Sequence, residues 1–295
     1  MLTEFPDRVA VITGAGSGFG REFARLAHGL GMRLALADID AEALAETVAG
    51  LEEIAPVAAG RVLTERVDVS VAEQVERLAL RSREALGQVD LLFNNAGVGA
   101  GGLIWENSVS DWDWVLGVNL WGVIHGIRAF VPGMLAQKTA GHVVNTASVA
   151  GLVSPPLMGV YNVSKHAVVT ATETLYHDLR HVQAQIGCSL LCPAFVPTGI
   201  ATSERNRPVR MAAPGPDTPS QALSRANTLR AVKAGRIGAA EVAHLTFDAI
   251  RNDRFYILTH PRILDSVRLR HADIERMRDP SDPYGTRADG ASRPS

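Results

Sequence analysis

Tyr161 and Lys165 are the residues of this sequence whose types and spacing most clearly indicate chemistry. On a helix, residues four apart lie on one face, with Cβ atoms roughly 5–6 Å from each other. A free phenol ionises near pH 10, and a neighbouring ammonium can lower that pKa by about 1–3 because it favours the phenolate. Ser148 lies shortly before this pair, where its hydroxyl could hold a substrate oxygen. The three residues together predict general acid–base chemistry at a hydroxyl or a carbonyl.

Each of these residues also has a plainer interpretation when it is taken alone. Tyr–Lys pairs on helices are usually surface packing, and Ser148 could cap a turn. The chemical interpretation is favoured because a candidate dinucleotide site precedes all three residues in the sequence.

That site is a glycine-rich turn between the first apolar run and the first expected helix. It reads Thr13-Gly14-Ala15-Gly16-Ser17-Gly18-Phe19-Gly20, which is the pattern T-G-x-x-x-G-x-G. Glycines allow a tight turn and a close approach to a pyrophosphate, which accepts N–H groups at the positive end of a helix. The alternative is a tight strand–helix turn without a ligand. The density of glycines after a β-branched run favours dinucleotide binding.

Asp38 ends the second apolar run, near the expected distance for the acid that binds the ribose 2′-hydroxyl. A carboxylate there would repel the additional phosphate of NADP, and the glycine turn itself contains no Arg or Lys. The sequence therefore predicts NAD rather than NADP. The alternative role for Asp38 is the N-cap of a helix beginning near Ala41, but Asp40 fits that role better.

Short β-branched runs alternate with longer amphipathic stretches, which is typical of parallel α/β proteins. The sequence predicts a single Rossmann-like, doubly wound parallel sheet of about seven strands with helices on both faces. Strands are expected at 8–13, 33–38, 61–67, 90–93, 142–147, 187–192 and 255–258. Helices are expected at 19–29, 41–53, 71–86, 160–185 and 239–252, and from near Asp111 towards Phe130.

The helix expected from near Asp111 has capping-box spacing at Ser110 and Asp113, and Pro132 and Gly133 are expected to disturb its end. One domain is expected over 1–278. Within it, the Pro-rich segment 198–238 is expected to be a substrate-binding loop with short helices, and 261–278 a helical extension. Residues 279–295 are rich in Asp, Pro, Gly, Ser and Arg and are expected to be a disordered tail.

The composition excludes several classes of protein. The chain has 295 residues, a formal net charge of −2, 46% hydrophobic residues and 20% charged residues, which suits a globular core. The near-neutral charge gives no electrostatic footprint for nucleic acid or an anionic membrane. No apolar run approaches the roughly 18 residues of a membrane span, and the N-terminus lacks the features of a secretion signal.

The cysteine and histidine residues indicate whether a disulfide or a metal site is expected. Cys188 and Cys192 are four residues apart on an expected strand, hence separated by about 13 Å, too far for a disulfide. A reduced, cytoplasmic protein is therefore expected. His177 and His181 have helical i, i+4 spacing but no evident third ligand, so no metal site is predicted. No G-x-S-x-G motif is present, which argues against an α/β-hydrolase.

Over about residues 7–260 the sequence resembles the short-chain dehydrogenase/reductase superfamily, in the branch with T-G-x-x-x-G-x-G and Y-x-x-x-K. The resemblance implies that Tyr161 is the acid–base and that Lys165 lowers its pKa and binds the nicotinamide ribose. It implies that Ser148 orients the substrate. Asn119, in Gly117-Val118-Asn119-Leu120, would complete a proton relay through water. The catalytic set is thus Asn119, Ser148, Tyr161 and Lys165.

The resemblance also implies the cofactor contacts. The family's N-N-A-G turn matches 94–97, beside the adenine ribose, and Asp68 matches the acid that contacts adenine. Ala194 replaces the glycine of the family's P-G pair, which puts the local backbone in question. The expected cofactor-binding residues are Gly14, Ser17, Gly18, Phe19, Gly20, Asp38, Ile39, Asp68, Val69, Asn95, Ala96, Gly97, Tyr161, Lys165, Pro193, Val196 and Thr198.

The predicted activity is reversible hydride transfer between NAD(H) and a secondary alcohol or its ketone. Ser148, Tyr161, Met158 and Phe195 are the expected substrate-binding residues. The expected walls of the substrate pocket are 98–101, 151–158, Phe195 and 198–238. Among these residues, Leu152, Val153, Leu157, Met158 and Phe195 suggest an apolar or aromatic substrate.

Segments 112–119, 122–124 and 130–132 are similar to bacterial dehydrogenases that oxidise the benzylic Cα alcohol of lignin-derived β-aryl ethers. The alternatives are a reductase of 3-oxoacyl, steroid or polyol substrates and a non-catalytic dinucleotide-binding regulator. The regulator is disfavoured because it would normally have lost part of the Tyr/Lys/Ser/Asn set. The family resemblance further implies a homodimer or homotetramer.

Overall fold

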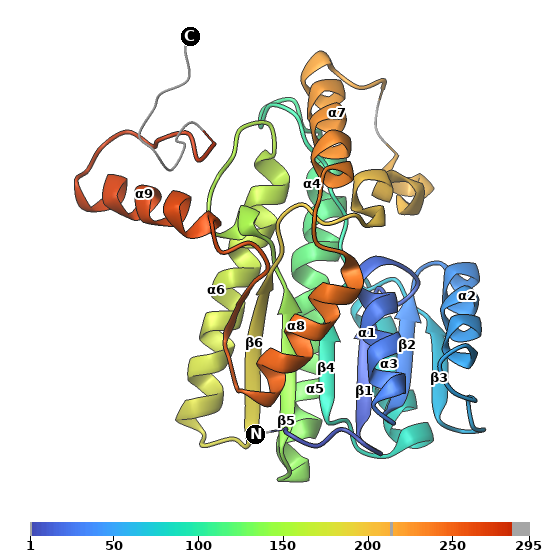
Figure 1. Ribbon diagram of the computed structural model, residues 1–295. Helices are drawn as coiled ribbons and strands as arrows, with labels where there is room; N and C mark the ends of the chain where they lie inside the picture. The colour runs from blue at the N-terminus through green and yellow to red at the C-terminus, as the bar shows by residue number, and fades with distance from the viewer. Residues whose placement is uncertain (1, 213–214, 285–295) are drawn as a thin grey trace.

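The computed structural model describes residues 2–212 and 215–284, in which seven strands form one parallel sheet (Figure 1). The strand order is β3-β2-β1-β4-β5-β6-β7, and every neighbouring pair is parallel. The order reverses at β1, as in doubly wound folds, which confirms the predicted fold class. The strands are β1 (Val9–Thr13), β2 (Arg33–Asp38), β3 (Val62–Arg66), β4 (Leu91–Asn94), β5 (Gly141–Thr146), β6 (Ile186–Cys192) and β7 (Tyr256–Leu258).

Helices cover both faces of this sheet because successive side chains of each strand point to opposite faces. Ala10 and Ile12 of β1 belong to one core cluster, whereas Val9 and Val11 belong to the other. The first cluster is formed with α1 (Gly18–Gly29), α2 (Ala41–Glu52) and α8 (Ala239–Arg251). The second is formed with α3 (Ala72–Leu86), α5 (Gly122–Gln137) and α6 (Gly159–His181).

The helix after β4 begins two residues earlier than the sequence predicts. α4 (Val109–Leu116) is capped by Ser108, whose side chain accepts from the Asp111 N–H while Asp111 accepts from Ser108. The predicted box at Ser110 and Asp113 is wrong, although both pairs have the same spacing. Ser110 instead donates to the carbonyl of Met211, a partner distant in the sequence.

Pro132 does not disturb the end of this helical stretch either. A π-helical turn (Gly117–Trp121) joins α4 to α5, and α5 contains Pro132 and continues to Gln137. The helix persists because Phe130, Val131 and Met134 bury its apolar face in the second core cluster. It ends at Lys138, which adopts a left-handed φ of 54°.

This stretch, Val109–Gln137, is the one helix of the described residues long and apolar enough to cross a membrane by length and composition. The sequence prediction had found no such stretch. Its best window is 44% buried, and it contains the fully buried Asn119, so it fits a core helix of this fold.

The Pro-rich segment after β6 contains more regular structure than expected. Two short 3-10 stretches, Gly199–Asn206 and Val209–Met211, precede α7 (Pro219–Lys233), a helix of 15 residues. Thr218 and Gln221 form a reciprocal capping box with Pro219 in the first turn, which explains where α7 starts. In Figure 1, α7 stands beyond the upper end of the sheet.

The C-terminal extension consists of α9 (Ile263–Glu275) and a returning segment that ends at Tyr284 in the described chain. The buried carboxylate of Asp273 accepts from Arg278 and from the Ser281 N–H, which holds this segment against α9. Residues 279–284 therefore have defined contacts. The rest of the expected tail, 285–295, lies outside the described residues.

Candidate active site

A cleft of about 480 Å³ opens at the end of the sheet where the carboxyl ends of the strands meet. Ligands of doubly wound folds bind at this edge, where the strand order reverses. Every expected cofactor and substrate residue lines the cleft except Gly20, and every expected catalytic residue lines it except Asn119. The structure thus brings together side chains from the ends of six strands, β1 to β6, and from α6.

The glycine turn has the geometry of a phosphate cradle. Gly14 has a φ of +67°, and a Cβ on it would lie 2.8 Å from the Ala96 Cα. Gly20 does not line the cleft, but a Cβ there would lie 2.0 Å from the Gly14 carbonyl oxygen. Glycine at 20 therefore lets α1 start directly against the turn, with its free N–H groups directed at the site.

Asp38 and Asp40 have separate roles. Asp40 caps α2 by accepting from the N–H groups of Glu42 and Ala43, as the sequence suggested. Asp38 lines the cleft and accepts from the N–H groups of Gly16, at 2.8 Å, and of Asp40, at 3.0 Å. Burial raises the pKa of Asp38, and these two backbone donors oppose the increase.

Residues 95 and 96 connect β1 to β4 beneath the cleft. The N–H groups of Asn95 and Ala96 donate to the Thr13 hydroxyl, and the Asn95 amide donates to the Thr13 carbonyl. Asp68 follows β3, and its Oδ1 accepts from the backbone N–H and the hydroxyl of Ser70. The two expected adenosine-side contacts thus both line the cleft.

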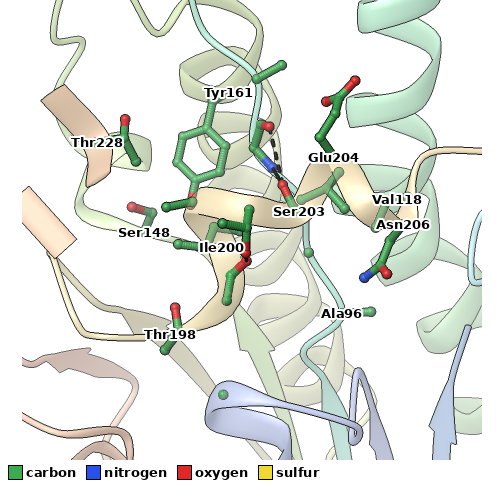
Figure 2. A pocket seen from close by; sticks show the side chains of 18 of the residues that line it. Ala96, Val118, Ser148, Tyr161, Thr198, Ile200, Ser203, Glu204, Asn206 and Thr228 are labelled. Atoms are coloured by element: carbon green, nitrogen blue, oxygen red, sulfur yellow. Dashed lines mark hydrogen bonds between the residues drawn. The ribbon is translucent and has the colours of Figure 1, made fainter. Parts of the chain in front are cut away.

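Tyr161 and Lys165 occupy the first turns of α6, and the Lys165 Nζ lies 5.7 Å from the centroid of the Tyr161 ring. Lys165 is 3% exposed, its Nζ donates to the Thr146 carbonyl at 2.9 Å, and burial lowers its pKa to about 8. Ser148 follows β5 and accepts from the Ala150 N–H. Figure 2 shows Ser148 beside the phenol of Tyr161.

The pKa of Tyr161 differs from the sequence prediction. Burial raises it, and the hydrogen bond with Ser148 is the influence that lowers it. Lys165 is not among the influences on this pKa, so its expected stabilisation of the phenolate stays a prediction. The Lys165 ammonium donates to the Thr146 carbonyl, and partial burial of the phenol disfavours the phenolate.

Asn119 lies behind the cleft and not in it. Its amide group donates to the Val98 carbonyl and the Ser164 hydroxyl, and its Oδ1 accepts from the Val98 N–H. A Cβ on Gly97 would lie 3.4 Å from the Asn119 Oδ1 and 3.6 Å from the Lys165 Nζ, so these groups meet around Gly97. Asn119 also sits in the π-helical turn, a feature frequent at functional sites.

The expected apolar walls are only partly correct. Met158 and Phe195 line the cleft, whereas Leu152, Val153 and Leu157 do not. Val153 is 1% exposed within the core, and the carbonyl of Leu157 accepts from Ser224 of α7. The expected segment 198–238 does supply a wall, and within it the face of α7 is of mixed polarity: Gln221, Ser224, Arg225, Thr228, Leu229 and Val232.

Sequence reasoning missed the polar residues that fix the segment after β6. Arg207 reaches the carboxylate of Asp111 at 2.7 Å, and its guanidinium lies 5.0 Å from the ring centroid of Trp114. All three line the cleft. A lone arginine in a Pro-rich stretch carries no local signal of a partner almost one hundred residues away.

Ala194 is accommodated without strain. It is not among the residues with positive φ, and its N–H donates to the Thr259 hydroxyl. The backbone here does not require the family's glycine. His177 and His181 belong to no metal-ligating group of three or more within residues 2–212 and 215–284.

A phosphate cradle at a strand-order switch, with a buried phenol, lysine and serine above it, defines a dinucleotide-dependent oxidoreductase site. Residues 8–208 match the model of the short chain dehydrogenase family, and the chain belongs to this family. The match covers the glycine turn, Asp38 and the complete catalytic set.

Three proteins illustrate the relationship. The chain is 59% identical to a short chain dehydrogenase/reductase from Burkholderia phymatum, solved in complex with NAD, with a TM-score of 0.93 over 96% of this chain and 99% of that one. It is 35% identical to the CLA biosynthesis dehydrogenase/reductase of Lactiplantibacillus plantarum, covering 88% and 90% of the two chains. It is 31% identical to the C alpha-dehydrogenase of a Sphingobium species, covering 97% and 92%.

Proposed function

We propose that this oxidoreductase transfers a hydride between NAD(H) and a secondary alcohol or its ketone. The observation that carries the proposal is the Tyr161 hydroxyl beside Ser148, in a cleft that is also lined by the glycine turn (Figure 2). Bound NAD(H) supplies the hydride acceptor or donor. The protein must then supply only a proton acceptor or donor and a hold on the substrate oxygen.

In this mechanism Tyr161 exchanges the proton with the substrate oxygen, and Ser148 holds that oxygen by hydrogen bonding. Because burial raises the pKa of Tyr161, the neutral phenol is favoured, which suits proton donation to a ketone. Alcohol oxidation requires the phenolate. Lys165, still largely protonated at pH 7 with a pKa of about 8, is the nearby cation that would stabilise it.

NAD is the proposed cofactor, and two observations support it. The carboxylate of Asp38 lies at the cleft, where it would accept from a ribose hydroxyl and repel a phosphate. The nearest cation after the turn, Arg21, already donates to the Gly16 carbonyl and pairs with Glu46. The Burkholderia neighbour, solved with NAD, points the same way.

For the substrate we propose an apolar, aromatic secondary alcohol of the benzylic class. Met158, Phe195 and Ile200 supply apolar surface near Tyr161, and the relationship to the C alpha-dehydrogenase supports this class. The polar face of α7 provides hydrogen-bonding groups for substituents further from the reacting carbon. Steroid, polyol and 3-oxoacyl substrates are the competing members of the test panel.

We also propose that residues 1–278 act as one catalytic domain, in the cytoplasm, as a homodimer or homotetramer. Two buried free thiols, Cys188 and Cys192, suit a reducing compartment. Trp121 and Val163, on the helical surface, are 49% and 43% exposed and are candidates for burial between subunits.

The decisive experiment is NADH formation with a panel of benzylic alcohols, hydroxysteroids, polyols and the 3-hydroxyacyl forms of 3-oxoacyl substrates, for the wild type and Tyr161→Phe. The variant is expected to lose about 10²–10⁴-fold in kcat with at least one benzylic alcohol, because it cannot transfer the proton. NADH binding should remain unchanged. Tyr176→Phe is the matched control, since Tyr176 lies on α6 against Phe255.

Turnover by Tyr161→Phe at the wild-type rate would refute the acid–base assignment. Turnover confined to steroids or polyols would refute the substrate class but leave the assignment of Tyr161 intact.

A further inference from the structure

The segment Gly199–Met211, here called the strap, crosses the cleft between Tyr161 and Val118 (Figure 2). Every residue from Gly199 to Pro208 lines the cleft. The strap starts beside the glycine turn, since a Cβ on Gly18 would lie 3.3 Å from the Thr198 Cβ. Near its other end, Arg210 lies 3.8 Å from Asp68, the expected adenine contact. A dinucleotide in this cleft would therefore have the strap along its length.

Two of the strap's attachments are weak. The Ser203 hydroxyl accepts from the Gly99 N–H at 3.0 Å and donates to the Gly99 carbonyl at 3.4 Å, and both hydrogen bonds join neutral groups (Figure 2). The Arg210–Asp68 pair is long, and the arginine side chain is 55% exposed, so solvent screens it.

Arg207 makes a further attachment of a different kind, next to the hydrogen bond from the Ser110 hydroxyl to the Met211 carbonyl. Its side chain is 5% exposed and faces the Asp111 side chain, 7% exposed, at 2.7 Å. Its other nitrogens donate to the Ser110 hydroxyl and the Met211 carbonyl. It also pairs with Glu204 and lies over the Trp114 ring. Each of the three guanidinium nitrogens therefore has a hydrogen-bond or ion-pair partner.

The acceptor of this attachment is held by a helix. The second carboxylate oxygen of Asp111 accepts from the backbone N–H and the hydroxyl of Ser108 in the capping box of α4. Its position is thus set by the start of α4 and not by the strap. Separating Arg207 from Asp111 would leave a buried carboxylate without its cation, which is strongly unfavourable.

We propose that Arg207 is the positioning residue that holds the strap closed over bound cofactor, and that its release from Asp111 limits how fast the cofactor leaves. The strap forms a wall of the cleft, so a bound dinucleotide departs only when that wall moves. Release of products is often rate-limiting in enzymes with such closures. The inference rests on the proposed binding of NAD, but it does not depend on the substrate.

The test is the dissociation rate of NADH, followed by stopped-flow fluorescence during displacement by excess NAD. Arg207→Met is expected to raise this rate about tenfold or more, because the closed strap loses its buried ion pair. Arg207→Lys keeps a charge near Asp111 but not the fork, so it should give an intermediate rate. Trypsin should cleave the strap, at Arg205 or Arg210, faster in NAD-bound Arg207→Met than in the NAD-bound wild type.

Arg268→Met is the matched control, because it removes an exposed Arg–Asp pair on α9, far along the chain from the strap. It should release NADH at the wild-type rate. The proposal is overturned if Arg207→Met and Arg207→Lys both release NADH at that rate. If Arg207→Met does not fold, Arg207→Lys alone decides, and a lowered melting temperature with unchanged release overturns the proposal. Absence of NADH binding by the wild type would instead refute the proposed function.

Discussion

At the residue scale, we propose that the acidic group at the end of β2 determines the choice of cofactor. Asp38 faces the cleft but is fixed by the N–H groups of Gly16 and Asp40, so its carboxylate cannot turn away from an incoming ribose. This arrangement combines attraction for a hydroxyl with repulsion of a phosphate. The sequence indicated the residue by its place after an apolar run, and the structure supplies the reason for its rigidity.

Asp38→Ser is expected to reduce kcat/KM with NAD by about 10–100-fold, since a charge-assisted hydrogen bond is worth about 1.5–3 kcal/mol. The efficiency with NADP should rise relative to that with NAD, because the repulsion is removed. Steady-state kinetics with both cofactors measures the ratio. Asp40→Ser is the matched control: serine also caps helices, and Asp40 does not line the cleft. An unchanged preference in Asp38→Ser would contradict the assigned role.

At the scale of elements, the joint between β1 and α1 determines how closely a ligand can approach the helix N-terminus. Gly20 lies within α1, where glycine is needed because it has no side chain and not because it is flexible. A methyl group there would overlap the Gly14 carbonyl, so the helix and the turn would have to separate.

Gly20→Ala is therefore expected to lower the free energy of unfolding by about 1–3 kcal/mol through overpacking and to weaken NADH binding. Gly29→Ala, at the other end of α1, is the matched control. A Cβ there meets only Ile54, at 3.6 Å, and alanine is the better helix former, so stability should stay constant or rise. Urea denaturation and NADH titration report both effects. Equal stabilities for the two variants would show that the turn can relax.

The same scale shows where local patterns were insufficient. The repeated spacing of Ser and Asp at 108–111 and 110–113 offered two starts for α4. In the structure α4 has the earlier start, and Ser110 and Asp111 make long-range contacts with Met211 and Arg207. Pro132 was expected to disturb a helix that burial on the sheet maintains. Both errors arise because tertiary contacts outweigh local preference.

At the scale of the whole molecule, the sheet and most of its helices were predictable, because each strand is a short apolar run. The predicted and observed bounds of β2 are identical, and those of the other strands differ by one or two residues. The carboxyl ends of parallel strands share an edge, so Ser148 and the glycine turn could be placed together from the sequence. The strap and α7 could not, since their positions depend on pairs such as Arg207–Asp111 and Ser224–Leu157.

The sheet interior also contains a titratable group that couples folding to pH. His142 of β5 is fully buried, and its Nε2 lies 2.7 Å from the Ser189 hydroxyl of β6. Burial lowers the pKa of His142 from 6.5 to about 3. Between these values the unfolded chain binds a proton that the native protein does not. The free energy of unfolding must therefore fall as the pH falls from about 6.5 towards 3.

His142→Asn removes this titratable group without introducing a charge. The wild type is expected to lose up to about 1.4 kcal/mol of stability per pH unit below 6.5 from this group, and the variant should lack that component. The variant will be less stable at pH 7, because it vacates a packed site, so the slope between pH 6.5 and 4.5 is the measurement. His271→Asn, at an exposed position on α9, should keep the wild-type slope. Parallel slopes for His142→Asn and the wild type would mean that His142 takes up its proton within the folded sheet.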